Sequence, residues 1–256
     1  MNRKAIIQVK DLTARYDEDT ILKDINFDIF EGEIFVILGG SGCGKSTLLK
    51  HLIGLIRPYS GRIIIDNEDI SHGDDKAFRR ILTRIGVLFQ SAALFGSMTL
   101  AENVALPIIE YTDLPADIID KIVSMKLSLV HLDGYENYLP SEISGGMKKR
   151  AGLARAMALN PKILFFDEPS AGLDPVTSSE LDNLIIHLNK NLGTTMVIVT
   201  HELQSIYNVA HRVIMLDKEA KGIIAEGDPK FLRDRSQNSF VSNFFNPQKL
   251  IQARAE

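Results

Sequence analysis

The residue types with the clearest chemistry lie between Gly39 and Thr47, where the chain reads GGSGCGKST. This segment fits the pattern G-x-x-x-x-G-K-[ST], in which glycines let the backbone curl until several N–H groups point at one anion. Lys45 can reach the outer phosphates of a nucleoside triphosphate, and the Ser46 hydroxyl can hold Mg²⁺. The predicted binding residues are Gly39, Gly40, Ser41, Gly42, Cys43, Gly44, Lys45, Ser46 and Thr47.

Other polar side chains follow short apolar runs that are typical of buried strands. They are Gln90, Asp167, Glu168 and His201. In open α/β sheets, ligands bind beyond the carboxyl ends of the strands, so these side chains are candidates for the same chemistry. Each also has a simpler explanation, because a polar residue at a strand end is often merely solvated. A zinc site at His201 is excluded, since Ser205 stands where a second histidine is required.

The elements that must position these residues alternate between strands and helices, which predicts an α/β fold. A buried strand, Ile34–Leu38, leads into the glycine-rich loop, and a helix over Lys45–Leu55 leaves it. Residues 5–36 alternate apolar and polar side chains and predict antiparallel strands. From 91 to about 155 the pattern is mostly helical and predicts a helical insertion, in which Thr99 and Glu102 fit a capping box at the start of a helix. We expect one catalytic domain over residues 1–235 and a tail over 236–256.

Composition excludes several classes of protein. A net charge of −4 gives no basic signature for nucleic-acid binding. The single cysteine rules out an internal disulfide and suits a reducing compartment. The N-terminus has no apolar signal-peptide core, and the longest charge-free run, Ile85–Ala101, is too short and too polar to span a bilayer. We therefore expect a soluble protein whose membrane role, if it has one, comes through a partner.

The order of these motifs resembles the ATPase subunits of ABC transporters from Ile6 to about Leu232. The motifs are the glycine-rich loop, Gln90, Ser144-Gly145-Gly146, Asp167-Glu168, Asp174 and His201. The resemblance implies a P-loop fold with a RecA-like core, an N-terminal antiparallel β subdomain and a helical subdomain. It also implies ATP and Mg²⁺ as cofactors. Mg²⁺ is implied at Ser46, Gln90 and Asp167, and catalysis at Glu168 as base, with Gln90 and His201 contacting the water and the γ-phosphate.

The same resemblance implies a head-to-tail homodimer. Ser144, Gly145 and Gly146 match the signature motif, which presses a helix N-terminus against the γ-phosphate of an ATP held by the other subunit. A capped helix alone would also explain these residues. Tyr16 matches the aromatic residue that stacks on adenine, although an exposed tyrosine can equally be a surface residue. Met147 departs from the usual glutamine and Ile143 from the usual leucine.

The segments SGGMKKRAGLARA and FFDEPSAGLDP are similar to those of Mla/Mce-type phospholipid trafficking ATPases. That similarity implies an integral membrane permease as partner, a small STAS-domain protein as a further partner, and a place on the cytoplasmic face of the inner membrane. The permease is expected to dock around residues 91–111. An ATPase of a small-solute importer and a cell-division regulator remain alternatives. A soluble ABC protein of DNA repair or translation is disfavoured, because the chain has neither a long coiled coil nor a second ATPase unit.

Two further features carry expectations of their own. Cys43 precedes a helix N-terminus, a position that favours a lowered thiol pKa. In the tail, large apolar residues share one face of a short helix that Pro247 is expected to end, and Leu250 and Ile251 follow. The helix residues are Phe240, Val241, Phe244 and Phe245. Such side chains are expected to be buried, either on their own chain or across the homodimer.

Overall fold

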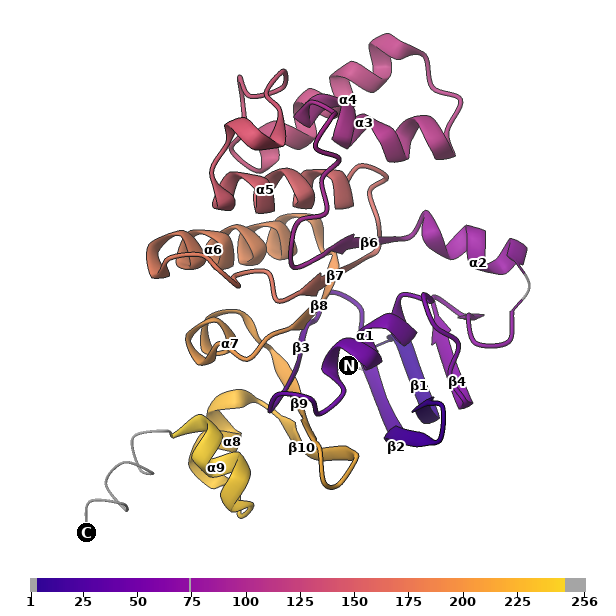
Figure 1. Ribbon diagram of the computed structural model, residues 1–256, viewed down its shortest axis with the longest axis vertical. Helices are drawn as coiled ribbons and strands as arrows, with labels where there is room; N and C mark the ends of the chain where they lie inside the picture. The colour runs from indigo at the N-terminus through magenta and orange to yellow at the C-terminus, as the bar shows by residue number, and fades with distance from the viewer. Residues whose placement is uncertain (1–3, 74, 247–256) are drawn as a thin grey trace. The chain divides into compact units, whose positions relative to one another are not determined.

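The computed structural model describes residues 4–73 and 75–246, and it divides the chain into two compact units (Figure 1). The first unit joins the N-terminal segment up to His72 with the segment from Ile198 onward. The second unit runs from Gly73 to Val197 and so includes the expected helical insertion together with the strands that flank it. Within the described residues, no helix combines the length and the apolar character that crossing a membrane requires.

The first unit contains the expected antiparallel sheet, with strand order β2-β1-β4-β5. Its strands are β1 (Ala5–Tyr16), β2 (Asp19–Phe30), β4 (Ser60–Ile65) and β5 (Glu68–Asp69). Ile7 lies opposite both Ile29 and Ile65, and all three side chains are buried, so the alternating pattern of the sequence marks the inner face. Tyr16 ends β1 and pairs with Asp19 across a tight turn.

A second group of strands in this unit carries the glycine-rich loop. The strands are β3 (Ile34–Gly39), β9 (Arg212–Asp217) and β10 (Gly222–Gly227), in the order β10-β9-β3. β3 is buried along its whole length and runs parallel to β9, with Val36 opposite Val213. Both faces of a parallel strand are covered, which explains the continuous apolar run of β3. The helices are α1 (Lys45–Leu52), α7 (Leu203–Val209), α8 (Pro229–Arg235) and α9 (Ser239–Phe245).

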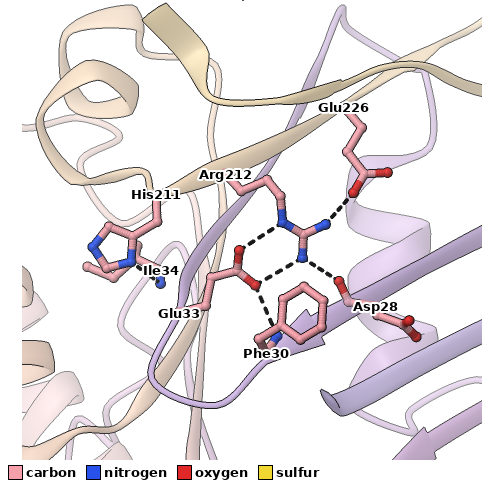
Figure 2. Close-up of polar contacts among 7 residues, drawn as sticks. All are labelled: Asp28, Phe30, Glu33, Ile34, His211, Arg212 and Glu226. Atoms are coloured by element: carbon pink, nitrogen blue, oxygen red, sulfur yellow. Dashed lines mark hydrogen bonds and ion pairs between the residues drawn. The ribbon is translucent and has the colours of Figure 1, made fainter. Parts of the chain in front are cut away.

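A polar network ties β9 to the turn that precedes β3 (Figure 2). The Arg212 guanidinium donates to both carboxylate oxygens of Glu33, over 2.8 and 3.0 Å, and also to the Asp28 carbonyl and the Glu226 carboxylate. Glu33 is only 4% exposed, and it accepts a further hydrogen bond from the Phe30 N–H. A buried carboxylate is stable there because a bidentate arginine and a backbone donor replace its water.

The tail packs on its own chain. In α9, Val241 and Phe245 are buried, and the Tyr207 hydroxyl of α7 donates to the Phe245 carbonyl over 3.1 Å. The Asn246 amide donates to the Arg233 carbonyl of α8. The expectation that all four apolar residues are buried is wrong for Phe240, which is 46% exposed, because α9 buries only the i, i+4 pair. Pro247, Leu250 and Ile251 lie outside the described residues.

The second unit contains strands in the order β8-β7-β6, of which β8 ends in the first unit. They are β6 (Ile85–Leu88), β7 (Ile163–Asp167) and β8 (Thr195–Val199). The helices are α2 (Asp75–Leu82), α3 (Leu100–Tyr111), α4 (Ala116–Leu129), α5 (Gly145–Ala156) and α6 (Pro175–Leu192), with a 3₁₀ turn, η1, at Pro140–Glu142. Helices α3, α4 and α5 pack on one another (Figure 1). The predicted capping box of α3 is confirmed, since Thr99 and Glu102 exchange hydrogen bonds.

Candidate functional site

The glycine-rich loop in the first unit has a backbone that requires glycine at two positions. Gly39 has φ +148°, and a Cβ there would lie 2.4 Å from the Leu216 carbonyl oxygen. Gly44 has φ +100° and is the N-cap of α1, with Leu22 close by. Larger residues at either position would meet both backbone strain and a steric clash. The outer face of the loop is open, because a Cβ at Gly40 or Gly42 would meet nothing within 4 Å.

The loop holds its lysine in place. Lys45 Nζ donates to the carbonyls of Gly39 and Gly40 over 2.9 and 3.0 Å. Lys45 also begins α1, whose first-turn N–H groups have no acceptor within the helix. An open loop, a helix N-terminus and a positioned ammonium together fit a triphosphate. The residues present therefore match the nucleotide that the sequence predicts.

The pKa of the Cys43 thiol differs from the expectation. Its side chain is 2% exposed, and burial raises the pKa of the thiol, although the Lys45 charge opposes that shift. The prediction of a lowered pKa is wrong because desolvation of the thiolate outweighs the helix N-terminus. The sulfur packs beneath Gly39. Gly40, Ser41 and Cys43 also line a cavity of about 460 Å³ whose other residues come from the β9–β10 region and the start of α9.

Two other candidates lie in the first unit. Tyr16 is 44% exposed at the end of β1, where its ring is accessible to a planar ligand. His201 is exposed and lies two residues after the end of β8. The preceding residue, Thr200, donates its N–H to the Ile37 carbonyl of β3, and its hydroxyl accepts from the Glu202 N–H. These contacts fix the segment that carries His201 to the strand that leads into the glycine-rich loop.

The second unit brings Gln90 and the Asp167-Glu168 pair to one sheet edge. β6 and β7 are parallel neighbours, and Leu88 lies opposite Phe166. Gln90 therefore lies two residues beyond the end of β6, at the same sheet edge where Asp167 ends β7 and Glu168 follows it. Glu168 has φ +45°, a left-handed conformation that is uncommon outside glycine and concentrates at functional sites.

Helix α5 holds both segments through side chains that the sequence motifs did not indicate. Lys149 Nζ donates to the Gln90 carbonyl over 2.5 Å and to the Glu168 carbonyl over 3.4 Å. The Arg155 guanidinium donates to the carbonyls of Ala92 and Ala93, which both have positive φ. Sequence motifs identify side chains that contact ligands directly. Lys149 and Arg155 instead contact backbone atoms of distant segments, so no motif marks them. The one signal for their role in the sequence is their position on the helix that follows Ser144-Gly145-Gly146.

The signature residues begin α5. Ser144 is the N-cap, and its hydroxyl accepts the Met147 N–H over 3.2 Å, so the capped-helix explanation of this motif holds. Ser144 and Gly145 are exposed, whereas Gly146 is buried, and a Cβ there would lie 2.5 Å from Thr177. Asp174 caps α6, and its pKa is lowered mainly by the Thr177 hydroxyl that donates to it.

Comparison with known proteins assigns the class. The family model "ABC transporter" matches residues 22–171, and the chain belongs to that family. It is an ATP-binding subunit and an ATPase with the P-loop fold of ABC cassettes. It is 33% identical to the ADP- and phosphate-bound dimeric cassette MJ0796, with a TM-score of 0.78 over 87% of this chain and 98% of that one. For cbiO1 of Clostridium perfringens the identity is also 33%, with a TM-score of 0.83 over 97% and 99%.

Two curated relatives narrow the comparison. The MlaF protein of Haemophilus influenzae, an intermembrane phospholipid transport ATP-binding protein, is 41% identical over 240 residues, which are 93% of this chain and 89% of the relative. The Mkl protein of Mycobacterium leprae, a probable ribonucleotide transport ATP-binding protein, is 44% identical over 244 residues, or 95% of this chain and 70% of the relative. The resemblance to an Mla-type ATPase is thereby confirmed. Mkl differs from MlaF in the transported molecule that its name states.

Proposed function

We propose that two copies of this chain bind ATP head to tail, with each nucleotide between Gly39–Thr47 of one copy and Ser144–Met147 of the other. The N-terminus of α5 supports this arrangement, because Ser144 and Gly145 are small and exposed there, and a helix N-terminus favours an anion. Tyr16 would stack on the adenine, since its ring is nearly half exposed at the end of β1. The dimeric MJ0796 cassette provides the precedent for two copies.

Ser46, Gln90 and Asp167 would hold Mg²⁺. Their hydroxyl, amide and carboxylate oxygens are the hard ligands that this ion prefers, and it binds proteins through few side chains together with substrate phosphates. When bound, the ion supplies charge neutralisation on the phosphate oxygens.

The hydrolytic step assigns one role to each remaining side chain. Glu168 accepts the proton of the attacking water, and Gln90 orients that water. Lys45 exchanges its two carbonyl partners for phosphate oxygens and stabilises their charge, while His201 donates to the γ-phosphate. Loss of the γ-phosphate removes contacts to both copies, so hydrolysis favours the separated arrangement of the dimer.

A groove in the second unit fits the permease. It has a volume of about 480 Å³ and combines aromatic and aliphatic walls with one cation and one carboxylate. Its residues are Phe89, Ala93, Phe95, Leu106, Pro107, Glu110, Tyr111 and Arg155. Phe95 and Tyr111 are 52% and 43% exposed, and exposed apolar side chains that gather in one groove are typical of an interaction site. The groove begins next to Gln90, so an occupant would act directly on the segment that senses the nucleotide.

The cargo we propose is phospholipid moving between inner and outer membranes, with the ATPase on the cytoplasmic face of the inner membrane and a small STAS-domain protein as further partner. The observation that carries this is the similarity to MlaF over 93% of the chain. Ribonucleotide transport is the second candidate, favoured by the similarity to Mkl.

Purification of the permease complex from native membranes, followed by reconstitution, separates the two cargoes. ATP hydrolysis is measured in proteoliposomes with phospholipid or with ribonucleotides as cargo, and lipids that copurify are identified by mass spectrometry. We expect bound phospholipid and turnover that responds to lipid composition, with the Glu168→Gln complex as the inactive control. Stimulation by ribonucleotides without lipid dependence would instead select the second candidate.

A further inference from the structure

A buried lysine on the signature helix lies where it can control the catalytic groups. Lys149 is 5% exposed on α5, and its ammonium donates to the carbonyl oxygens of Gln90 and Glu168. Those two residues come from different strands of the second unit. One cation therefore joins the backbone of the glutamine that faces the nucleotide to the backbone of the catalytic base.

The chemistry of this contact is specific. A buried ammonium is costly unless hydrogen bonds replace its water, so an apolar residue would serve better if filling space were the only need. The ammonium offers three donors and therefore holds several acceptors at once. Glu168 has a left-handed backbone, and the Ala92 and Ala93 pair after Gln90 does too. Segments in such conformations keep them only when surrounding contacts hold them.

The position of Lys149 on the helix adds a second connection. It lies five residues after Ser144, about 7.5 Å along the helix axis. On the proposed function, Ser144 faces the ATP of the other copy. In the proposed dimer, helix α5 of one copy therefore meets the nucleotide held by the other copy at its N-terminus. Its Lys149 side chain contacts the catalytic segments of its own copy.

We propose that Lys149 is a positioning residue that aligns Gln90 and Glu168 according to whether the signature end of α5 is engaged by the other copy's ATP. This inference rests on the proposed function. Binding of a nucleotide at Ser144 shifts or orders α5, and Lys149 carries that change to both carbonyls. Each active site then depends on the nucleotide bound at the other, which makes hydrolysis cooperative in ATP concentration.

The test compares two buried lysines of the same unit. Lys149→Met removes the ammonium and keeps the chain length, and Lys149→Arg keeps the charge. Lys126→Met is the matched control, because Lys126 on α4 is 3% exposed and donates to the Asn160 side chain over 2.5 Å, away from Gln90 and Glu168. For each variant we would measure ATP affinity with a fluorescent nucleotide, kcat, KM, the Hill coefficient and the melting temperature.

We expect Lys149→Met to lower kcat by about ten- to a hundredfold, the cost of slightly misplaced catalytic groups, with ATP affinity within about threefold of wild type. The Hill coefficient should fall toward that of independent sites, and Lys149→Arg should restore most of kcat and of the cooperativity. Lys126→Met should shift only the melting temperature. If Lys149→Met does not fold, Lys149→Gln, a shorter neutral donor, takes its place with the same expected results.

Equal kcat and Hill coefficients in the Lys149 and Lys126 variants would overturn the inference, as would a loss confined to ATP affinity. The Glu168→Gln protein separates this failure from a failure of the proposed function. If Glu168→Gln is inactive and the Lys149 variants match wild type, only the inference is wrong. If Glu168→Gln still turns over, the assigned base is wrong and the proposed site falls with it.

Discussion

In the proposed site, the first unit would bind phosphate mainly through the backbone of one loop, whereas the second would use side chains whose own backbone is held by Lys149 and Arg155 of helix α5. In the first unit, nine consecutive residues set the loop, and Lys45 is held by carbonyls five and six residues away. In the second, Lys149 is 59 residues from Gln90 and 19 from Glu168. A loop built from neighbouring residues should tolerate substitutions in other parts of the chain. The sheet edge that carries Gln90 and Glu168 depends on contacts with helix α5, so a partner that moves the helix can alter it.

Arg212 of the first unit and the two cations of helix α5 in the second unit contact different kinds of acceptor. Arg212 in the first unit is paired with Glu33 and Glu226 and also contacts the Asp28 carbonyl, so it joins strands of both sheets. Lys149 and Arg155 in the second unit donate to carbonyls of loop segments. Breaking the Arg212–Glu33 pair would leave a buried carboxylate unpaired, whereas Lys149 and Arg155 contact neutral carbonyls and keep their own charge only while an acceptor lies within reach. We therefore expect the loop segments that Lys149 and Arg155 hold to follow any change in helix α5.

The largest effect should come from Lys45→Ala. Removing the ammonium loses a charge-assisted contact to the phosphates, about 2–3 kcal/mol, so ATP affinity should fall by about 30- to 150-fold and turnover should vanish. Nucleotide titration and a phosphate-release assay measure both. Lys50→Ala, an exposed change on the same helix, should leave both unchanged. Near-normal turnover in a folded Lys45→Ala protein would remove the loop from the site.

Glu168→Gln should slow hydrolysis without weakening ATP binding, and so separate the role proposed for the second unit from that proposed for the first. Without the base, kcat should fall by about 10²–10⁴-fold while ATP still binds. The dimer should then persist with Mg·ATP, which size-exclusion chromatography detects. Glu180→Gln, at an exposed position on α6, is the control and should behave as wild type. A fast Glu168→Gln enzyme would assign the base elsewhere, with His201 as the next candidate.

The same contrast explains what sequence could predict. The loop, the capping box at Thr99 and the strand before Asp167 were predicted because each depends on neighbouring residues. The pKa of Cys43 was predicted in the wrong direction, since burial is a property of the packed fold and not of the loop. Lys149 and Arg155 were not identified, because nothing in a lysine on a helix indicates which distant carbonyl it meets. The roles assigned to Tyr16, Gln90 and His201 stay predictions.

The tail tests whether the first unit also depends on long-range packing. Phe245 is 3% exposed and Phe240 is 46% exposed on the same short helix. Phe245→Ala should lower the free energy of unfolding by up to about 3–5 kcal/mol, the usual cost for a buried phenylalanine. Phe240→Ala should change it by less than about 0.5 kcal/mol. If Phe240→Ala weakens the dimer instead, the exposed ring serves a contact with the second copy.

The smallest effect should be a pH dependence that originates in α1. His51 is 3% exposed, and burial lowers the pKa of its imidazole below the ordinary 6.5, although the hydrogen bond to the Ile56 carbonyl opposes that shift. Because the carbonyl only accepts, the neutral ring carries its proton on Nδ1. As pH falls below 6.5, the unfolded chain takes up a proton before the folded chain does, so stability is lost.

His51→Gln keeps a donor for the Ile56 carbonyl but does not titrate. Chemical denaturation between about pH 5 and 8 should therefore show that wild type loses more stability than the variant on acidification, with the two curves parallel above pH 7. Parallel curves over the whole range would mean that His51 takes up its proton equally in both states. In that case the packing around the C-terminal end of α1 does not change the proton affinity of His51, and this residue contributes nothing to the pH dependence of stability.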